Sequence, residues 1–163
     1  MPELPITYLP NSLTPRDKIQ QLNMIRKSRK KYKQHRYFTR KKLTSYTNRP
    51  SKHIRNARKI YDVETITPNR KLALATGCSI PALQKIVNKG EGAYYSSGSR
   101  PNQTPQSWGL ARLASAITGG KSAAVDYNII RDGCRHTKRA FILANKARRK
   151  YGFGHSKTKK NYA

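Results

Sequence analysis

Apolar side chains recur at helical spacing in the first third of the chain. Ile19, Leu22 and Ile25 follow one another at intervals of three residues, which places them on one face of a helix. Thr14 precedes this stretch as a candidate N-cap, and the proline after it suits the first helical position. The pattern predicts a helix from about residue 15 to the low thirties, whose later turns contain almost nothing apolar.

Residues 68–89 show a second pattern, which resembles a helix-turn-helix. A short helix is followed by a tight turn at Gly77 and Cys78, and a second helix directs Leu83 and Ile86 toward the core. The same spacing occurs in plain helical hairpins, so a purely structural hairpin is the favoured interpretation and DNA binding the alternative. If the hairpin reads DNA, the exposed residues of its second helix that would contact base edges are Gln84, Lys85 and Asn88.

The remaining pattern predicts several further helices. Ser51 can cap a helix that ends near Tyr61, and Thr104 can cap one whose inward face includes Trp108. Ser122 can cap a helix that carries Val125 toward the core and is stopped by Gly133. Alanines on one face predict a last helix over about residues 137–151. Residues 89–105, rich in Gly, Ser, Asn and Pro, are predicted to form a loop.

Together these elements predict a mainly α protein. We expect a small helical domain, made of the hairpin plus two further short helices, with extended basic N- and C-terminal arms. The predicted parts are a Pro-rich extended arm (1–14), a basic helical arm (15–60), a compact helical domain (61–134), and a basic helix and tail (135–163). The tail through Lys157, Lys159 and Lys160 is expected to become ordered only when it is bound.

The charge distribution supports this division and indicates an anionic partner. The 163 residues carry 35 Lys and Arg against 7 Asp and Glu, a net charge of +28. Residues 16–60 hold 17 basic residues and one acidic residue, and residues 135–163 hold 10 basic residues and none that is acidic. Repulsion at this density opposes compaction unless an anion neutralises it. Nucleic acid, an anionic membrane surface and an acidic protein lattice all remain open as partners.

Two groups of side chains follow as candidate binding residues. The densest basic runs predict polyanion binding by Arg26, Lys27, Arg29, Lys30, Lys31, Lys33, Arg36, Arg40, Lys41, Lys42, Arg148, Arg149 and Lys150. Aromatic rings interleaved with these cations could stack on bases, but packing against Lys and Arg stems is favoured. The segment around residues 92–108 is a candidate partner-binding loop through Tyr94, Tyr95, Arg100, Asn102 and Gln103.

Several classes of chemistry are disfavoured. Cys78 and Cys134 are the only cysteines, which suits a reducing compartment with two packed thiols. No paired metal-ligand spacing, phosphate-binding glycine loop or nucleophile–base pair is present, so we expect no metal, no cofactor and no enzymatic activity. The chain also lacks a spanning apolar segment and a secretory signal.

One long motif carries a resemblance. The segments GAYYSSGSRPNQTPQSW (92–108) and ARLASAITGGK (111–121), followed by Val125 and Asp126, resemble an uncharacterised domain family of large double-stranded DNA viruses of algae and protists. The resemblance covers roughly residues 60–134. It brings no activity or site residue with it. What it implies is a setting, namely an icosahedral virus with an internal membrane around its genome.

In that setting the chain is expected to be a viral structural protein. We expect a minor capsid protein on the inner face of the shell, made in the host cytoplasm, not secreted, and bridging capsid neighbours and an anionic surface. Its partners would be the major capsid protein, other minor capsid proteins, and the inner membrane surface or viral DNA, with no small-molecule substrate. The alternative is a DNA-binding protein, acting in genome packaging or condensation or as a helix-turn-helix regulator.

Overall fold

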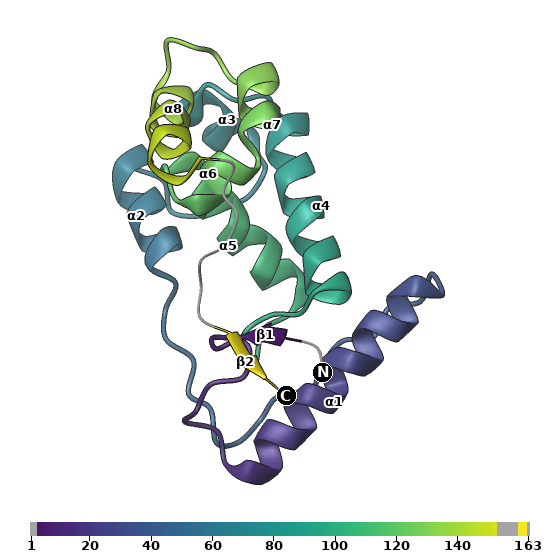
Figure 1. Cartoon of the computed structure of the whole chain (residues 1–163). Helices are drawn as coiled ribbons and strands as arrows, with labels where there is room; N and C mark the ends of the chain where they lie inside the picture. Colours follow the sequence, from purple (N-terminus) through teal and green to yellow (C-terminus); the bar gives the residue numbers. More distant parts are fainter. Residues whose placement is uncertain (1–2, 153–159, 163) are drawn as a thin grey trace. The chain divides into compact units, whose positions relative to one another are not determined.

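A computed structural model describes residues 3–152 and 160–162, and within them the chain is mainly α-helical, as predicted. The described part forms eight helices and two three-residue strands (Figure 1). In chain order they are β1 (Glu3–Pro5), α1 (Pro15–Lys33), α2 (Lys52–Tyr61), α3 (Arg70–Thr76), α4 (Ile80–Ser96), α5 (Pro105–Ile117), α6 (Lys121–Val125), α7 (Tyr127–Gly133), α8 (Arg139–Tyr151) and β2 (Lys160–Tyr162).

The helices belong to two compact units. Of the described residues, unit 1 takes 3–49, 91–108 and 160–162, and unit 2 takes 50–90 and 109–152. The boundaries fall within α4 and α5, so each of these helices contributes residues to both units. This division differs from the four consecutive parts expected from the sequence.

Unit 1 is organised by α1 and by the segments that pack on it. Thr14 caps α1 as predicted, its hydroxyl accepting the Asp17 N–H at 3.2 Å. The buried stripe of the helix differs from the expected one, since Ile19 is exposed. The side chains that the helix buries are Asp17, Gln21, Met24, Ile25 and Ser28. A small apolar cluster of Leu13, Met24 and Leu43 lies beside it, with Phe38 and Tyr46 packed against it.

The predicted basic arms are not confirmed. Leu4, Leu9 and Leu13, which the Pro-rich N-terminal segment carries, are buried, because unit 1 uses them as core residues. At the other end, β2 pairs antiparallel with β1, with Leu4 opposite Asn161 in register. Lys160 of the predicted tail therefore belongs to a strand, whereas Lys157 and Lys159 lie outside the described residues.

Asp17 ties the start of α1 to a distant loop. Its carboxylate accepts hydrogen bonds from the Ser45 N–H at 3.0 Å and from the Ser45 hydroxyl at 2.5 Å. These two hydrogen bonds hold the pKa of Asp17 below its ordinary value, and the bond from the Ser45 hydroxyl has the larger effect. Asp17, the only acidic residue of the basic stretch 16–60, thereby ties the start of α1 to the segment that carries Ser45.

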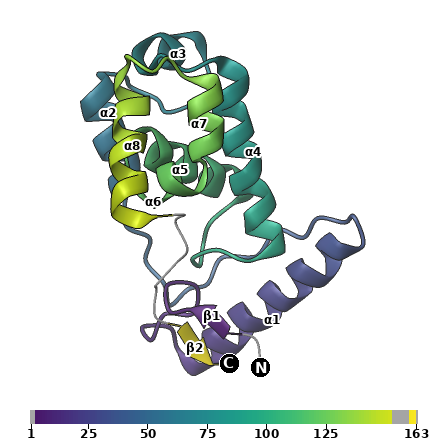
Figure 2. The same ribbon diagram turned by 45° about the horizontal axis from the view of Figure 1, so that its top comes forward.

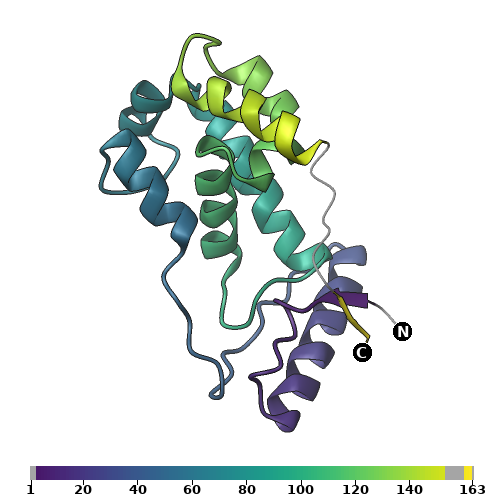
Figure 3. The ribbon, with the colours of Figure 1, turned by 60° about the vertical axis from the view of Figure 1, so that its left-hand side comes forward.

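Unit 2 is a bundle of short helices around one apolar core. Helix α8 packs against α6 and α7 (Figure 2), and α2 packs against α3 (Figure 3). The predicted inward face of α8 is confirmed, since Ala140, Ala144 and Ala147 are all buried. Trp108 is not part of this core. It belongs to unit 1, where its ring meets the edge of Tyr8 with centroids 5.8 Å apart.

The predicted hairpin forms from α3 and α4. Gly77 ends α3 in the left-handed region, at φ 77°, and its N–H donates to the Ala73 carbonyl at 2.9 Å. A residue with a Cβ is disfavoured in this conformation, which explains why a glycine stands at the turn. The hairpin is therefore confirmed as a structural element.

The prediction of two packed thiols is wrong, because Cys78 and Cys134 form a disulfide. The turn after α3 and the end of α7 lie side by side, joined by backbone hydrogen bonds from Ser79 N–H to Gly133 O at 2.8 Å and from Arg135 N–H to Gly77 O at 2.9 Å. Two cysteines 56 residues apart in the sequence carry no spacing that predicts this contact. The sequence-based argument for a reducing compartment loses its basis.

The predicted loop at residues 89–105 is partly helical. Helix α4 continues through Gly90 and Gly92 to Ser96, although glycine disfavours a helix interior. A Cβ at Gly90 would lie 2.6 Å from the Cα of Gly109 in α5, so the close approach of the two helices requires a glycine at position 90. Tertiary packing here outweighs the local preference for a loop.

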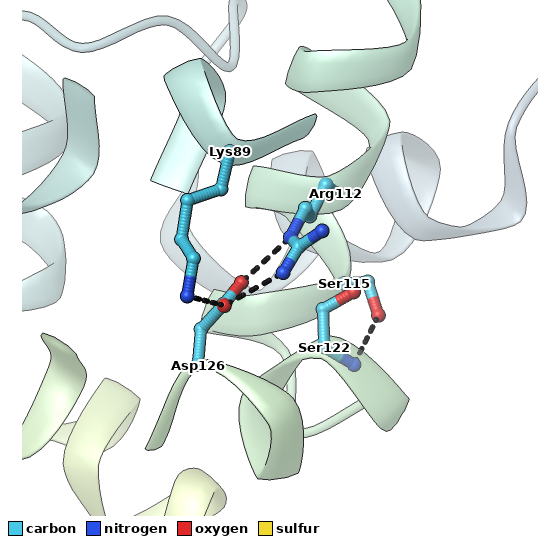
Figure 4. Close-up of polar contacts among 5 residues, drawn as sticks. All are labelled: Lys89, Arg112, Ser115, Ser122 and Asp126. Atoms are coloured by element: carbon cyan, nitrogen blue, oxygen red, sulfur yellow. Dashed lines mark hydrogen bonds and ion pairs between the residues drawn. The ribbon is translucent and has the colours of Figure 1, made fainter. Parts of the chain in front are cut away.

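The single helix expected from Ser122 to Gly133 is two helices, α6 and α7, which meet at Asp126. Ser122 is not the cap. Helix α6 starts one residue earlier, and the Ser122 N–H donates to the Ser115 hydroxyl of α5 at 3.4 Å (Figure 4). The break also turns Val125 outward, and it is 47% exposed where the sequence predicted a core position.

No helix among residues 3–152 combines the length and the apolar character needed to cross a membrane.

We expect removal of the disulfide to destabilise unit 2. The Cys78→Ser, Cys134→Ser double variant lacks this cross-link, so its unfolded chain has more conformational entropy. The free energy of unfolding should fall by about 2–4 kcal/mol. Urea unfolding followed by far-ultraviolet circular dichroism measures this. The matched control is the unsubstituted protein with a reducing agent, which should lose the same amount, whereas the double variant should not respond to it. Equal stability of oxidised protein and variant would contradict the prediction.

Candidate polyanion-binding surface

The second half of α1 separates an inward face from a cationic outward face. Ile25 and Ser28 point inward and are buried. Arg26, Lys30 and Lys33 are exposed and, at spacings of four and three residues, follow one stripe about 10 Å long. We call the accessible cations of this region the α1 basic surface, namely Arg26, Lys27, Arg29, Lys30, Lys31, Lys33, Arg36, Lys41 and Lys42, of which Arg29 and Lys31 are half-buried.

Hydrogen bonds within unit 1 hold this half of α1 in place. The Ser28 hydroxyl donates to the Tyr95 carbonyl at 3.1 Å. Arg29 donates through Nε and Nη2 to the Ser97 carbonyl, at 2.9 and 2.6 Å. Both acceptors lie at the end of α4, so these bonds anchor α1 there at Ser28 and Arg29. The members of the α1 basic surface that lie on the helix therefore flank a point at which it is anchored within unit 1.

Arg40 does not belong to that surface, although the sequence placed it there. Its side chain is buried, and its guanidinium donates to the Ser28 hydroxyl at 3.0 Å, the Tyr94 carbonyl at 2.9 Å and the Ser99 hydroxyl at 2.8 Å. The guanidinium also lies over the Tyr94 ring, 3.7 Å from the centroid. Burial lowers the pKa of Arg40 from its ordinary value. This cation organises the interior of unit 1.

The candidate partner-binding loop is also largely structural. Tyr94 is fully buried, and its hydroxyl accepts the Arg40 N–H at 2.9 Å. Asn102 is half-buried and bonds the backbone of residues 43 and 46. Gln103 accepts from the Ser107 hydroxyl at 2.8 Å. Arg100 is exposed, and Tyr95 is half-buried with its ring stacked on Tyr32 of α1. These two residues remain candidates for contact with a partner.

Tyr95 takes part in a group of rings beside the α1 basic surface, which we call the tyrosine cluster: Tyr32, Tyr37 and Tyr95. Tyr32 and Tyr95 are nearly parallel, with centroids 6.3 Å apart, and Tyr37 lies 4.9 Å from Tyr95. The sequence shows tyrosines among the cations near α1 but gives no sign that Tyr95 joins them. Only the fold brings this ring across from the end of α4.

The chain reversal after α1 completes the cluster. His35 adopts a left-handed conformation, φ 56°, and its N–H donates to the Tyr32 carbonyl at 3.0 Å. The Arg36 N–H donates to the Lys31 carbonyl at 2.9 Å. This turn directs Tyr37 back toward the end of the helix. The next residue, Phe38, lies beneath the ammonium group of Lys27, which is 4.5 Å from the centroid of the ring.

The other predicted binding residues lie in unit 2. Arg148, Arg149 and Lys150 are exposed in the last turn of α8, where cations suit the helix dipole. Arg148 lies over the Tyr127 ring, 4.3 Å from its centroid. They belong to a different unit from the α1 basic surface and form a separate basic patch.

The candidate base-contacting residues are accessible. Gln84, Lys85 and Asn88 are all exposed on α4, as a DNA-reading role requires. The Gln84 amide nitrogen donates to Asn88 Oδ1 at 2.8 Å, one helical turn away. This hydrogen bond uses one donor of Gln84 and the carbonyl oxygen of Asn88, which are groups that would otherwise be free to contact a base.

The most buried ion pair in the described residues is structural. The Asp126 carboxylate is fully buried and accepts two hydrogen bonds of 2.8 Å from Arg112, with Lys89 Nζ at 3.5 Å (Figure 4). Arg112 lies on α5, Lys89 on α4 and Asp126 at the junction between α6 and α7, so these contacts join the three places. Residues 3–152 contain no group of three or more His, Cys, Asp or Glu side chains that could hold a metal ion.

Comparison with known proteins identifies a family for this chain. Residues 5–132 match a family of unknown function (DUF5824), and since the match spans most of the sequence, the chain belongs to that family. The matched range includes the α1 basic surface, the tyrosine cluster and the hairpin, whereas α8 lies beyond it. No curated protein and no solved structure matches.

Arg40→Met tests the structural assignment of that residue. It should lower the free energy of unfolding of unit 1 by about 3 kcal/mol, since a hydrogen bond from a charged donor contributes about 1.5–3 kcal/mol and the Tyr94 carbonyl loses its donor. Fluorescence of Trp108, which lies in unit 1, reports the transition during urea unfolding. The matched control, Lys41→Ala at the exposed neighbour, should change stability by no more than about 0.5 kcal/mol. Equal effects of the two substitutions would refute the assignment.

Proposed function

We propose that this chain is a structural protein that binds a polyanion through the α1 basic surface. The observation that carries the proposal is the anchored second half of α1, whose exposed charged residues are all cations. No acidic residue occurs between Asp17 and Asp62, so no side chain of this stretch can neutralise them. Repulsion among these cations is relieved when an anionic surface lies against the helix.

The capsid role follows from the resemblance of residues 60–134 to a domain family of large double-stranded DNA viruses. In this proposal the chain is a minor capsid protein on the inner face of an icosahedral shell. It contacts the major capsid protein and other minor capsid proteins, and its α1 basic surface faces the inner membrane or the genome. The two-unit fold supports such a bridging role, because each unit has its own basic patch.

DNA recognition by the hairpin is the second candidate. The exposure of Gln84, Lys85 and Asn88 on α4 favours it. The small number of cations on the hairpin disfavours it, since phosphate contacts supply most of the affinity for duplex DNA.

Two double variants separate the candidates. If the α1 basic surface contacts about six to ten phosphates, affinity for duplex DNA should fall about 10³–10⁵-fold between about 50 and 200 mM salt. Lys30→Ala with Lys33→Ala should reduce the salt slope by about 2 and weaken binding to heparin and to anionic vesicles as well. The matched control, Gln84→Ala with Asn88→Ala, should leave all of these unchanged.

Fluorescence anisotropy of a labelled duplex and vesicle sedimentation provide the measurements. Absence of binding to duplex DNA, heparin and anionic vesicles at physiological salt would overturn the polyanion proposal. Loss of binding to one particular duplex sequence in the Gln84→Ala, Asn88→Ala variant, with the α1 variant unaffected, would instead establish the hairpin as the reader.

The capsid role predicts a location. Virions of the virus that encodes this chain, separated into shell, membrane and core, should contain it in the shell fraction when each fraction is analysed by mass spectrometry. Recovery in the core with the genome would favour the DNA-binding alternative. Absence from the virion would overturn the capsid role.

A further inference from the structure

The tyrosine cluster is more exposed than aromatic side chains of a core. Tyr37 is 71% exposed and Tyr32 is 38% exposed, and among the described residues the cluster belongs to neither of the two apolar core clusters. Leaving Tyr37 at the surface forgoes the free energy of burying a ring, yet the fold turns the chain at His35 to place it against Tyr95. The fold thus leaves these rings accessible to solvent at a defined position.

The cluster also lies where the positive charge is highest. Tyr32 is within α1, between the cations of its last turns, and Tyr37 directly follows Arg36. Its supports are rigid, because the Ser28 hydroxyl holds the Tyr95 carbonyl and Arg29 holds the Ser97 carbonyl. Aromatic rings and cations are therefore held together on one side of unit 1.

This combination discriminates among polyanions. A membrane surface supplies negative charge but no flat aromatic partner for exposed rings, and an acidic protein carries no regular alternation of anionic groups and flat rings. Duplex DNA keeps its base faces stacked inside the helix. An unpaired strand offers both a phosphate backbone for the cations and free base faces for stacking.

We propose that the tyrosine cluster and the α1 basic surface together form a binding site for single-stranded nucleic acid, in which bases stack on Tyr37 and Tyr32 while phosphates contact the cations of α1. The site rests on the proposed function, since it takes polyanion binding by the α1 basic surface as its starting point and specifies the class of polyanion. Recognition is independent of base sequence, because every base has a face that can stack.

The test compares two probes of equal charge, an oligothymidylate of about 12 nucleotides and an abasic strand of the same length. The full-length protein should bind the oligothymidylate more tightly. Tyr37→Ala should weaken that binding by about 5- to 150-fold while leaving the abasic strand unaffected. Tyr37→Phe, which keeps the ring, should restore the preference. Lys30→Ala with Lys33→Ala should weaken both probes together.

The outcomes distinguish this inference from the proposed function. Equal affinity for the two probes, unchanged by Tyr37→Ala, would overturn the tyrosine site while leaving polyanion binding intact. Failure of the protein to bind either strand at physiological salt would overturn both, provided that the anionic vesicles and heparin are also not bound. Tyr37 is largely exposed, and unchanged circular dichroism and Trp108 fluorescence confirm that the variants are folded.

Discussion

Unit 1 depends on the hydrogen bonds that the buried guanidinium of Arg40 donates. The surrounding sequence has no carboxylate to pair with it, so the fold satisfies this cation with neutral oxygens from Ser28, Tyr94 and Ser99. A buried charge without partners would be strongly unfavourable. Those acceptors come from α1 and from residues 91–108, which means that the same interaction assembles the two halves of the unit.

That arrangement determines which cations are available for binding. With Arg40 directed inward and Ser28 and Arg29 bonded to the end of α4, the basic residues of α1 itself are displayed on a helix that is anchored at those two residues. The same contacts carry Tyr95 to Tyr32. Because the backbone of α1 is already held in a helix, binding costs little backbone entropy, which favours affinity for an extended anionic partner.

In unit 2, a disulfide and a buried carboxylate join segments that are distant in the sequence. The disulfide joins the hairpin turn to the end of α7, and the Asp126 carboxylate joins α4 and α5 to the α6–α7 junction. Short helices such as α3, α6 and α7 are not stable alone, so these links and the alanine face of α8 hold them in one core.

Local pattern determined much of this protein. Helical periodicity with a cap at Thr14 or Ser51 predicted α1 and α2, Gly77 predicted the hairpin turn, and the distribution of Lys and Arg predicted which helix would be cationic. These depend on neighbours within a few residues. The tertiary structure alone decided the rest: that Arg40 and Tyr94 are buried, that Gly90 lies inside a helix against Gly109, that Cys78 meets Cys134, and that Tyr95 joins Tyr37. Each of these depends on a partner far away in the chain, and hydrophobic periodicity contains no information about which distant segments will meet.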